Sequence, residues 1–266
     1  MEVFDSELTS DALTARVRVF QRKRGHRYSF DDVVTAWVAA RAVPEARTHL
    51  DLGCGIGSVL LMIADRLPVV RSVGIEAQTE SYALACRNVA HNRLSERVCV
   101  LHGDLRDREL ASSFELVTGT PPYKKPGTAT PSPDPQRAYA RIELRGGVED
   151  YLASAARWLA PEGTCVVCMD ANGEERVWAG ASAAGLRVEA RLDVVPIAAH
   201  KARLFSVFTL RRQASAPRSP FTADEFALRD ANGARTEAAF ELRTFFGLSN
   251  PVQEAPSPPR GEARGA

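Results

Sequence analysis

The sequence has 266 residues, of which 45% are hydrophobic and 25% charged, and its formal net charge is +1. This composition is typical of a globular protein large enough for one α/β domain, and the balanced charge does not by itself indicate a polyanionic partner. No apolar run approaches the roughly 20 residues of a membrane helix, and no basic start precedes an apolar stretch, so we expect neither membrane insertion nor secretion.

Cationic residues gather near the start of the chain, within residues 1–30, which we interpret as a basic N-terminal arm. No carboxylate falls within the cationic run. A solvated face is the usual explanation of such a run, and a phosphate-binding patch is the functional alternative. The members of the run are Arg16, Arg18, Arg22, Lys23, Arg24 and Arg27.

From about residue 48 to residue 211, short β-branched and apolar runs alternate with longer amphipathic patterns. This alternation predicts an α/β fold with a mainly parallel sheet and helices on both faces. We expect seven strands, at 49–53, 72–77, 98–104, 114–120, 163–170, 191–197 and 204–212. We expect helices at 32–41, 57–66, 79–92, 148–159 and 174–184. Too few residues separate the last two strands for a helical crossover, so the sheet should end in an antiparallel hairpin.

The remaining segments differ from this alternation. Residues 124–138 are rich in proline, threonine and serine and follow a predicted strand, so we interpret them as a flexible loop. Ala231-Asn232-Gly233 indicates a turn, and an amphipathic helix is expected after it. We therefore expect one domain over residues 31–248, followed by a disordered tail at 249–266.

The five cysteines form no disulfide or metal framework, because only Cys165 and Cys168 have a C-x-x-C spacing. Both fall in a predicted buried strand, where positions three apart point to opposite faces. Core packing is therefore favoured over metal or redox chemistry, and we expect no bound metal. Free cysteines fit a reducing cytoplasm.

A glycine-rich turn follows the first strand of the alternating region, where DLGCGIGS begins at Asp51 and opens a helix. Gly53, Gly55 and Gly57 permit a tight turn and let a ligand approach the bare backbone, and a helix N-terminus favours electronegative groups. Many strand–helix turns need glycine, but the position of this one favours a nucleotide-like ligand.

Acidic residues end the next two strands. Glu76 can accept both ribose hydroxyls of an adenosine, and Asp104 is placed to accept from an adenine amino group or to cap a helix. A nicotinamide cofactor would also suit Glu76, although the G-x-G-x-G spacing differs from the G-x-G-x-x-G of dehydrogenases.

The motif Thr120-Pro121-Pro122-Tyr123 lies at the end of the fourth strand, where α/β sheets place their ligands. Two prolines leave carbonyls free to accept, so Thr120 Oγ and the Pro121 carbonyl can receive hydrogens from a flat group that bears an amine. Tyr123 would stack on that group. The structural alternative is a proline-rich turn with a packed tyrosine.

With these motifs the sequence resembles class I S-adenosylmethionine-dependent methyltransferases, most closely the bacterial adenine-N6 methyltransferase family that modifies a valine tRNA. The resemblance covers about residues 18–245. The matching segments are GHRYSFDDVVTAWVA at the entry, DLGCGIGS, GIEAQ and HGDL for the cofactor, TPPY for the substrate, and FALRDANGARTEAAFELR for the closing hairpin and helix.

The resemblance implies a Rossmann-like fold, S-adenosyl-L-methionine as the cofactor, and methyl transfer to the N6 amine of an adenine in tRNA. It implies catalytic roles for Thr120, Pro121, Pro122 and Tyr123. It implies cofactor contacts from Tyr28, Asp51, Gly53, Gly55, Gly57, Glu76, Asp104 and Thr120. Lys124, Lys125 and the cationic run would meet RNA phosphates. We expect a cytoplasmic monomer.

Two positions depart from the family pattern. Thr120 stands where the family has asparagine, and a hydroxyl is a shorter, rotating acceptor. Ile142 stands where the family has histidine. The alternatives are therefore a methyltransferase acting on a protein glutamine or on RNA guanine N2, and a non-catalytic RNA-binding protein that retains the fold.

Overall fold

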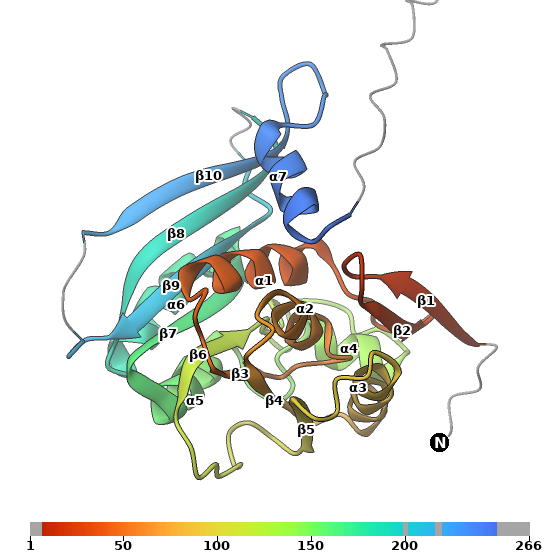
Figure 1. Ribbon diagram of the computed structural model, residues 1–266. Coiled ribbons are helices and arrows are strands. Elements are labelled where there is room, and N and C mark those ends of the chain that lie inside the picture. The colour runs from red at the N-terminus through yellow and green to blue at the C-terminus, as the bar shows by residue number, and fades with distance from the viewer. Residues whose placement is uncertain (1–6, 199–201, 216–219, 249–266) are drawn as a thin grey trace, which may run out of the picture.

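A mostly parallel, twisted sheet of eight strands runs through the computed structural model, which describes residues 7–198, 202–215 and 220–248 (Figure 1). The order across the sheet is β10-β8-β9-β7-β6-β3-β4-β5. The strands are β3 (Thr48–Leu52), β4 (Arg71–Glu76), β5 (Val98–His102), β6 (Phe114–Gly119), β7 (Leu159–Asp170), β8 (Leu186–Ile197), β9 (Phe205–Arg212) and β10 (Thr222–Arg229). The expected α/β, Rossmann-like class is confirmed.

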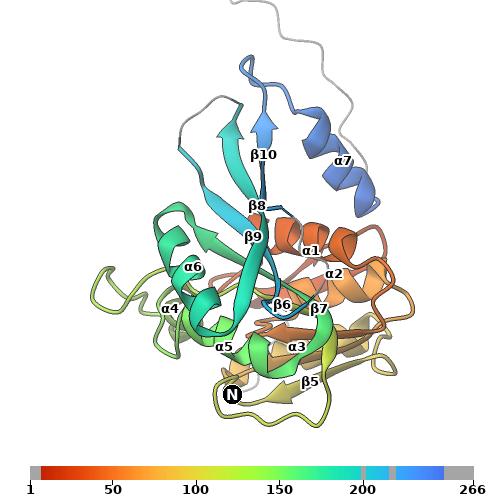
Figure 2. The same ribbon diagram turned by 90° about the vertical axis from the view of Figure 1, so that its left-hand side faces the viewer.

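Helices cover both faces of the sheet, as Figures 1 and 2 show. On one face lie α1 (Phe30–Ala42), α2 (Ser58–Arg66) and α3 (Thr79–His91), and α7 (Glu237–Phe245) packs against α1 and β10. On the other face lie α5 (Val148–Trp158) and α6 (Glu174–Ala183). Cys165 and Cys168 on β7 belong to the two different cores, so their expected placement on opposite faces is confirmed.

The sheet has one strand more than the seven expected, and the hairpin of β8 and β9 does not end it. These two strands are antiparallel as expected, but β10 adds beyond β8 in the parallel direction. The sequence analysis missed β10 because its side chains are mostly polar and exposed, with Phe226 alone fully buried within it. Such an edge strand lacks the apolar run by which buried strands are recognised.

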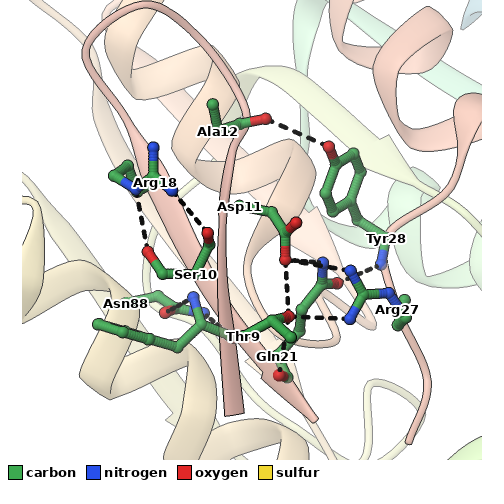
Figure 3. A network of polar contacts seen from close by, with 10 residues as sticks. Thr9, Ser10, Asp11, Ala12, Arg18, Gln21, Arg27, Tyr28 and Asn88 are labelled. Atoms are coloured by element: carbon green, nitrogen blue, oxygen red, sulfur yellow. Dashed lines mark hydrogen bonds and ion pairs between the residues drawn. The ribbon is translucent and has the colours of Figure 1, made fainter. Parts of the chain in front are cut away.

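The N-terminal residues fold against α3 as a two-stranded hairpin, β1 (Leu8–Ala12) and β2 (Arg18–Arg22). The Asn88 amide of α3 accepts from the backbone N–H of Phe20 at 2.7 Å and donates to its carbonyl at 3.1 Å, like a neighbouring strand. Figure 3 shows the side chains that join this hairpin to the segment before α1.

Residues 124–138 are not a loop throughout, because α4 (Pro135–Arg141) begins within them. Asp134 caps this helix by accepting from the Arg137 N–H at 3.0 Å, and Pro135 occupies the first helical position. An aspartate followed by proline is a helix start signal that the composition of the segment obscured. The tail at 249–266 lies outside the described residues, within which no helix is both long and apolar enough to cross a membrane.

The chain direction across the sheet places the functional site. From β3 the chain adds β4 and β5 on one side, and β6 and β7 form on the other side of β3. A crevice opens at the carboxyl ends of the strands where the order reverses in this way. The turns after β3, β4 and β6 therefore meet at one place.

Candidate active site

The turn from β3 to α2 is a backbone cradle. Gly53, Gly55 and Gly57 all adopt left-handed conformations, with φ of +59°, +57° and +88°. A Cβ at Gly53 would lie 2.1 Å from the Tyr151 hydroxyl of α5, so a side chain at this position would be both strained and obstructed. Gly53 and Gly55 line a cavity that faces the N-terminus of α2.

Glu76 ends β4 at the wall of this first cavity. Its two carboxylate oxygens accept from the backbone N–H groups of Gly55 at 2.8 Å and Gln78 at 2.6 Å. Burial raises the pKa of Glu76, and these bonds act in the opposite direction. The carboxylate is therefore held rigidly at the glycine turn with oxygen lone pairs still available.

Asp104 lines the same cavity, and no helix begins at this residue, so it is not a helix cap. Its carboxylate accepts from the Arg106 backbone N–H at 3.0 Å and pairs with the Arg106 guanidinium at 2.8 Å. Hydrogen bonding from Arg106 lowers the pKa of Asp104. The residue thus closes a turn and keeps a charged acceptor at the cavity wall. Tyr28 lines the cavity from the opposite side, and its hydroxyl donates to the Ala12 carbonyl at 3.2 Å.

Asp51 lies behind the glycine turn and not among the residues of the cavity wall. It accepts from the Thr118 hydroxyl at 2.7 Å and from the Leu60 N–H in the first turn of α2. Burial raises its pKa to about 8. Asp51 therefore supports the cradle from beneath and does not itself face a ligand.

The Thr120–Tyr123 motif lines a second cavity, which has a volume of about 530 Å³ and adjoins the first, of about 100 Å³. The Tyr123 ring forms part of its wall, and the Tyr123 hydroxyl donates to Asp31 at 2.6 Å and lies 3.2 Å from Cys168 Sγ. The motif is thus both a packed turn and a cavity wall. The residues that line both cavities are His26, Asp32, Thr120, Pro122 and Ala140.

Asp32, which the sequence analysis did not select, lies at the junction of the two cavities. Its Oδ2 accepts from the Ser29 N–H at 3.1 Å and from the Ser58 hydroxyl at 3.0 Å, and the nearby Thr120 side chain lowers the pKa of this carboxylate. Burial and the neighbouring Asp31 raise the pKa of Asp32 to about 7. A serine three residues before an acidic residue is a capping-box signal, which gives no hint of the second contact with Thr120.

The structure divides the cations that the sequence analysis grouped together. Lys23, Arg24, Arg27 and Lys124 line the second cavity, joined by two residues that sequence reasoning missed, Arg137 and Arg141 of α4. Two of the lining cations are themselves paired, Arg27 with Asp11 at 3.1 Å and Lys124 with Asp170 at 3.0 Å, and the remaining cations lie outside the cavity wall. Arg16 pairs with Asp65 at 2.8 Å, Arg18 bonds Ser10, Arg22 pairs with Asp134 at 2.8 Å, and Lys125 is exposed beside Lys124.

Comparisons with known proteins find methyltransferase relatives and the same kind of fold. Residues 29–133 match the family model described as methyltransferase small domain. The chain is 32% identical over 208 residues to a tRNA1(Val) (adenine(37)-N6)-methyltransferase of Porphyromonas gingivalis, covering 74% of this chain and 79% of that protein. It is 39% identical over 125 residues to a release factor glutamine methyltransferase of Caulobacter vibrioides, covering 46% of this chain and 43% of that protein. A predicted O-methyltransferase from Agrobacterium tumefaciens shares the fold, with a TM-score of 0.58, 19% identity, and coverage of 83% of this chain and 98% of that one.

Proposed function

This chain belongs to the tRNA1(Val) (adenine(37)-N6)-methyltransferase family, and we propose that it methylates the exocyclic N6 amine of an adenine in tRNA. It is an S-adenosylmethionine-dependent enzyme. The observation that carries the proposal is the position of Thr120 and Pro122, which line both the cavity beside the glycine turn and the cavity beside Tyr123. A methyl donor in the first and an amine in the second would meet there.

The first cavity fits S-adenosylmethionine chemically. Glu76 offers carboxylate oxygens for ribose hydroxyls, Asp104 offers an acceptor for the adenine amine, and Ile75 and Leu105 supply apolar surface for the ring. The open space beside Gly55, where an added Cβ would meet no atom within 4 Å, would allow close approach of the methionine part. When bound, the cofactor supplies a methyl group already activated by its sulfonium.

The chain's own contribution is to hold the target amine in line with that methyl group. Thr120 Oγ and the Pro121 carbonyl would accept the two N6 hydrogens, which favours a more pyramidal and more nucleophilic nitrogen. Tyr123 would stack on the base and offset the cost of taking it out of its loop.

Asp32 would give the rotating Thr120 hydroxyl a fixed direction, because its carboxylate lies beside this side chain. If the carboxylate receives the Thr120 hydrogen, the oxygen lone pairs of Thr120 are available to the amine. A proton released by the amine on methylation can pass to Thr120 Oγ as the hydroxyl hydrogen passes to Asp32. The adjacent carboxylate would thus compensate for the absence of the family's asparagine amide.

The cations around the second cavity support an RNA substrate. Lys23, Arg24, Arg137 and Arg141 line the second cavity and would contact phosphates next to the target base. A tRNA substrate would place the enzyme in the cytoplasm. A protein glutamine has weaker support as the substrate than an adenine in tRNA, because the similarity to the glutamine methyltransferase covers under half of each chain.

Methylation with radiolabelled S-adenosylmethionine and unmodified host tRNA tests the proposal directly. After digestion, we expect the label in N6-methyladenosine. Label in N2-methylguanosine would identify guanine as the methylated base. Label only in added release factor would identify a protein glutamine as the substrate. Cofactor binding with no label in RNA or protein would indicate a non-catalytic binder.

Glu76→Ala is expected to weaken cofactor binding roughly 10-fold or more, because a carboxylate acceptor is lost together with its bonds to the Gly55 N–H of the glycine turn and the Gln78 N–H after β4. Calorimetry with S-adenosylhomocysteine measures the change. Glu109→Ala, an exposed carboxylate outside the cavity wall, is the matched control and should leave the affinity unchanged. Equal affinities for the two variants would exclude the ribose role.

Thr120→Val should lower single-turnover methyl transfer roughly fivefold, because it removes one acceptor while keeping the shape of the side chain. Thr120→Asn introduces the family's residue, whose amide can donate to Asp32 and accept from the amine, so transfer should at least equal the wild type. Rapid-quench transfer with saturating cofactor is the measurement. If the valine variant matched the wild type, Thr120 would not contact the amine.

A further inference from the structure

A third cavity, of about 790 Å³, opens between α1, the end of β8, β10 and α7, and we call it the arginine groove. Arg27, Arg229, Arg235 and Arg243 line it, with Phe30 and Phe226 in its apolar wall. Among the described residues that line the groove there is no carboxylate. Arg27 is paired with Asp11 at 3.1 Å, so the groove combines the charge of the remaining arginines with a largely apolar wall.

The turn that the sequence analysis marked at residues 231–233 brings two of these arginines together. Asp230 closes the turn by accepting from the backbone N–H groups of Asn232 and Ala234, each at 2.9 Å. Arg229 and Arg235 are consequently neighbours across a backbone bridge, and both are exposed. The Arg229 guanidinium donates to the Gly233 carbonyl, which is a neutral partner.

The groove is continuous with the proposed base slot. Arg27 and Ser29 line both the groove and the second cavity, and Tyr28 lines both the groove and the first cavity. A molecule that fills the second cavity and extends past Ser29 therefore enters the arginine groove.

Resting on the proposed function, we propose that the arginine groove binds the tRNA strand that continues from the target adenine. Guanidinium groups pair with phosphates in a forked geometry, and unstacked bases pack on aromatic and apolar surface. The exposed Arg229 and Arg235 supply the guanidinium groups, and the partly exposed Phe30 and Leu228 supply the apolar surface, along one path. The edge strand β10 and the helix α7 would thus help to hold the substrate.

The test is Arg229→Gln/Arg235→Gln, in which glutamine can still donate to the Gly233 carbonyl. The matched control is Arg47→Gln/Arg71→Gln, a second pair of exposed arginines joined through the backbone, at the start of β3 and β4 and outside all three cavities. Binding of labelled valine tRNA transcript is measured by fluorescence anisotropy from 50 to 200 mM salt. Calorimetry with S-adenosylhomocysteine verifies that each variant retains its cofactor site.

We expect the groove variant to bind the transcript roughly 10-fold more weakly, with a salt slope lower by about two, and the control to behave as the wild type. Methylation of a short RNA confined to the base slot should be equal in all three proteins. If wild type and groove variant bind the transcript alike, the groove does not contact the strand. If the wild type binds no RNA, the proposed function fails and the inference fails with it.

Discussion

Tyr123→Ala is expected to lower methyl transfer to tRNA roughly 10- to 100-fold, because stacking of a base on an aromatic ring contributes about 1–3 kcal/mol. The affinity for S-adenosylhomocysteine should stay nearly unchanged, because the Tyr123 ring borders the second cavity and not the first. Transfer under single-turnover conditions and calorimetry of the cofactor site measure the two effects separately.

A second variant is needed at Tyr123 to separate a loss of stacking from a loss of stability. Its ring packs against both cores and its hydroxyl contacts Asp31 and Cys168, so truncation to alanine also costs about 3–5 kcal/mol of stability. Tyr123→Phe keeps the ring and loses only the hydroxyl, and it should retain transfer within a few fold. A folded alanine variant with full activity would show that the base does not stack there.

The positions of the site residues along the sheet were predictable because strand ends are visible in the sequence. Gly53, Glu76, Asp104 and Thr120 each follow an apolar run, and parallel strands bring their carboxyl ends to one edge. The same reasoning misplaced Asp51. Asp51 directly precedes the glycine turn, where a ligand contact is expected, but its side chain accepts a hydrogen bond from Thr118.

Contacts between distant segments were not predictable. The cationic run is uniform in sequence, yet Arg16 meets Asp65, while Lys23 and Arg24 face the second cavity. In the sequence alone, Asp32 has the pattern of a helix-capping residue. Its contact with Thr120 exists only because α1 packs across the end of β6.

The pH dependence of transfer provides the sharpest test of Asp32. Its carboxylate must be ionised to receive the Thr120 hydrogen, and its pKa is raised to about 7 in the folded protein. We therefore expect kcat/KM for S-adenosylmethionine to rise about tenfold per pH unit below pH 7 and to level off above it. In the pH profile of kcat, the acid limb should lie at lower pH than in the profile of kcat/KM. The positive charge of a bound sulfonium would stabilise the ionised carboxylate of Asp32 and so lower its pKa.

Asp32→Asn should remove this limb and lower transfer at pH 8 roughly 10- to 100-fold. The groups that face Asp32 are Asp31 beside it, Tyr28 before α1, Asp51 on β3 and Cys168 on β7. Burial raises the pKa values of Tyr28 and Cys168, so both stay neutral near pH 7. Because the pKa of Asp51 is raised to about 8, Asp51→Asn is the control, and its profile should keep the limb near pH 7.

Stability has the opposite pH dependence, which separates catalysis from unfolding. The pKa of Asp32 is raised from 3.8 to about 7 by folding, so the folded protein binds more protons between these values. The stability that Asp32 contributes is therefore greatest at low pH and is lost as pH rises through 7. An acid limb in transfer that disappears in Asp32→Asn cannot arise from acid unfolding at this residue, because protonation of Asp32 stabilises the fold while it disables the proposed acceptor.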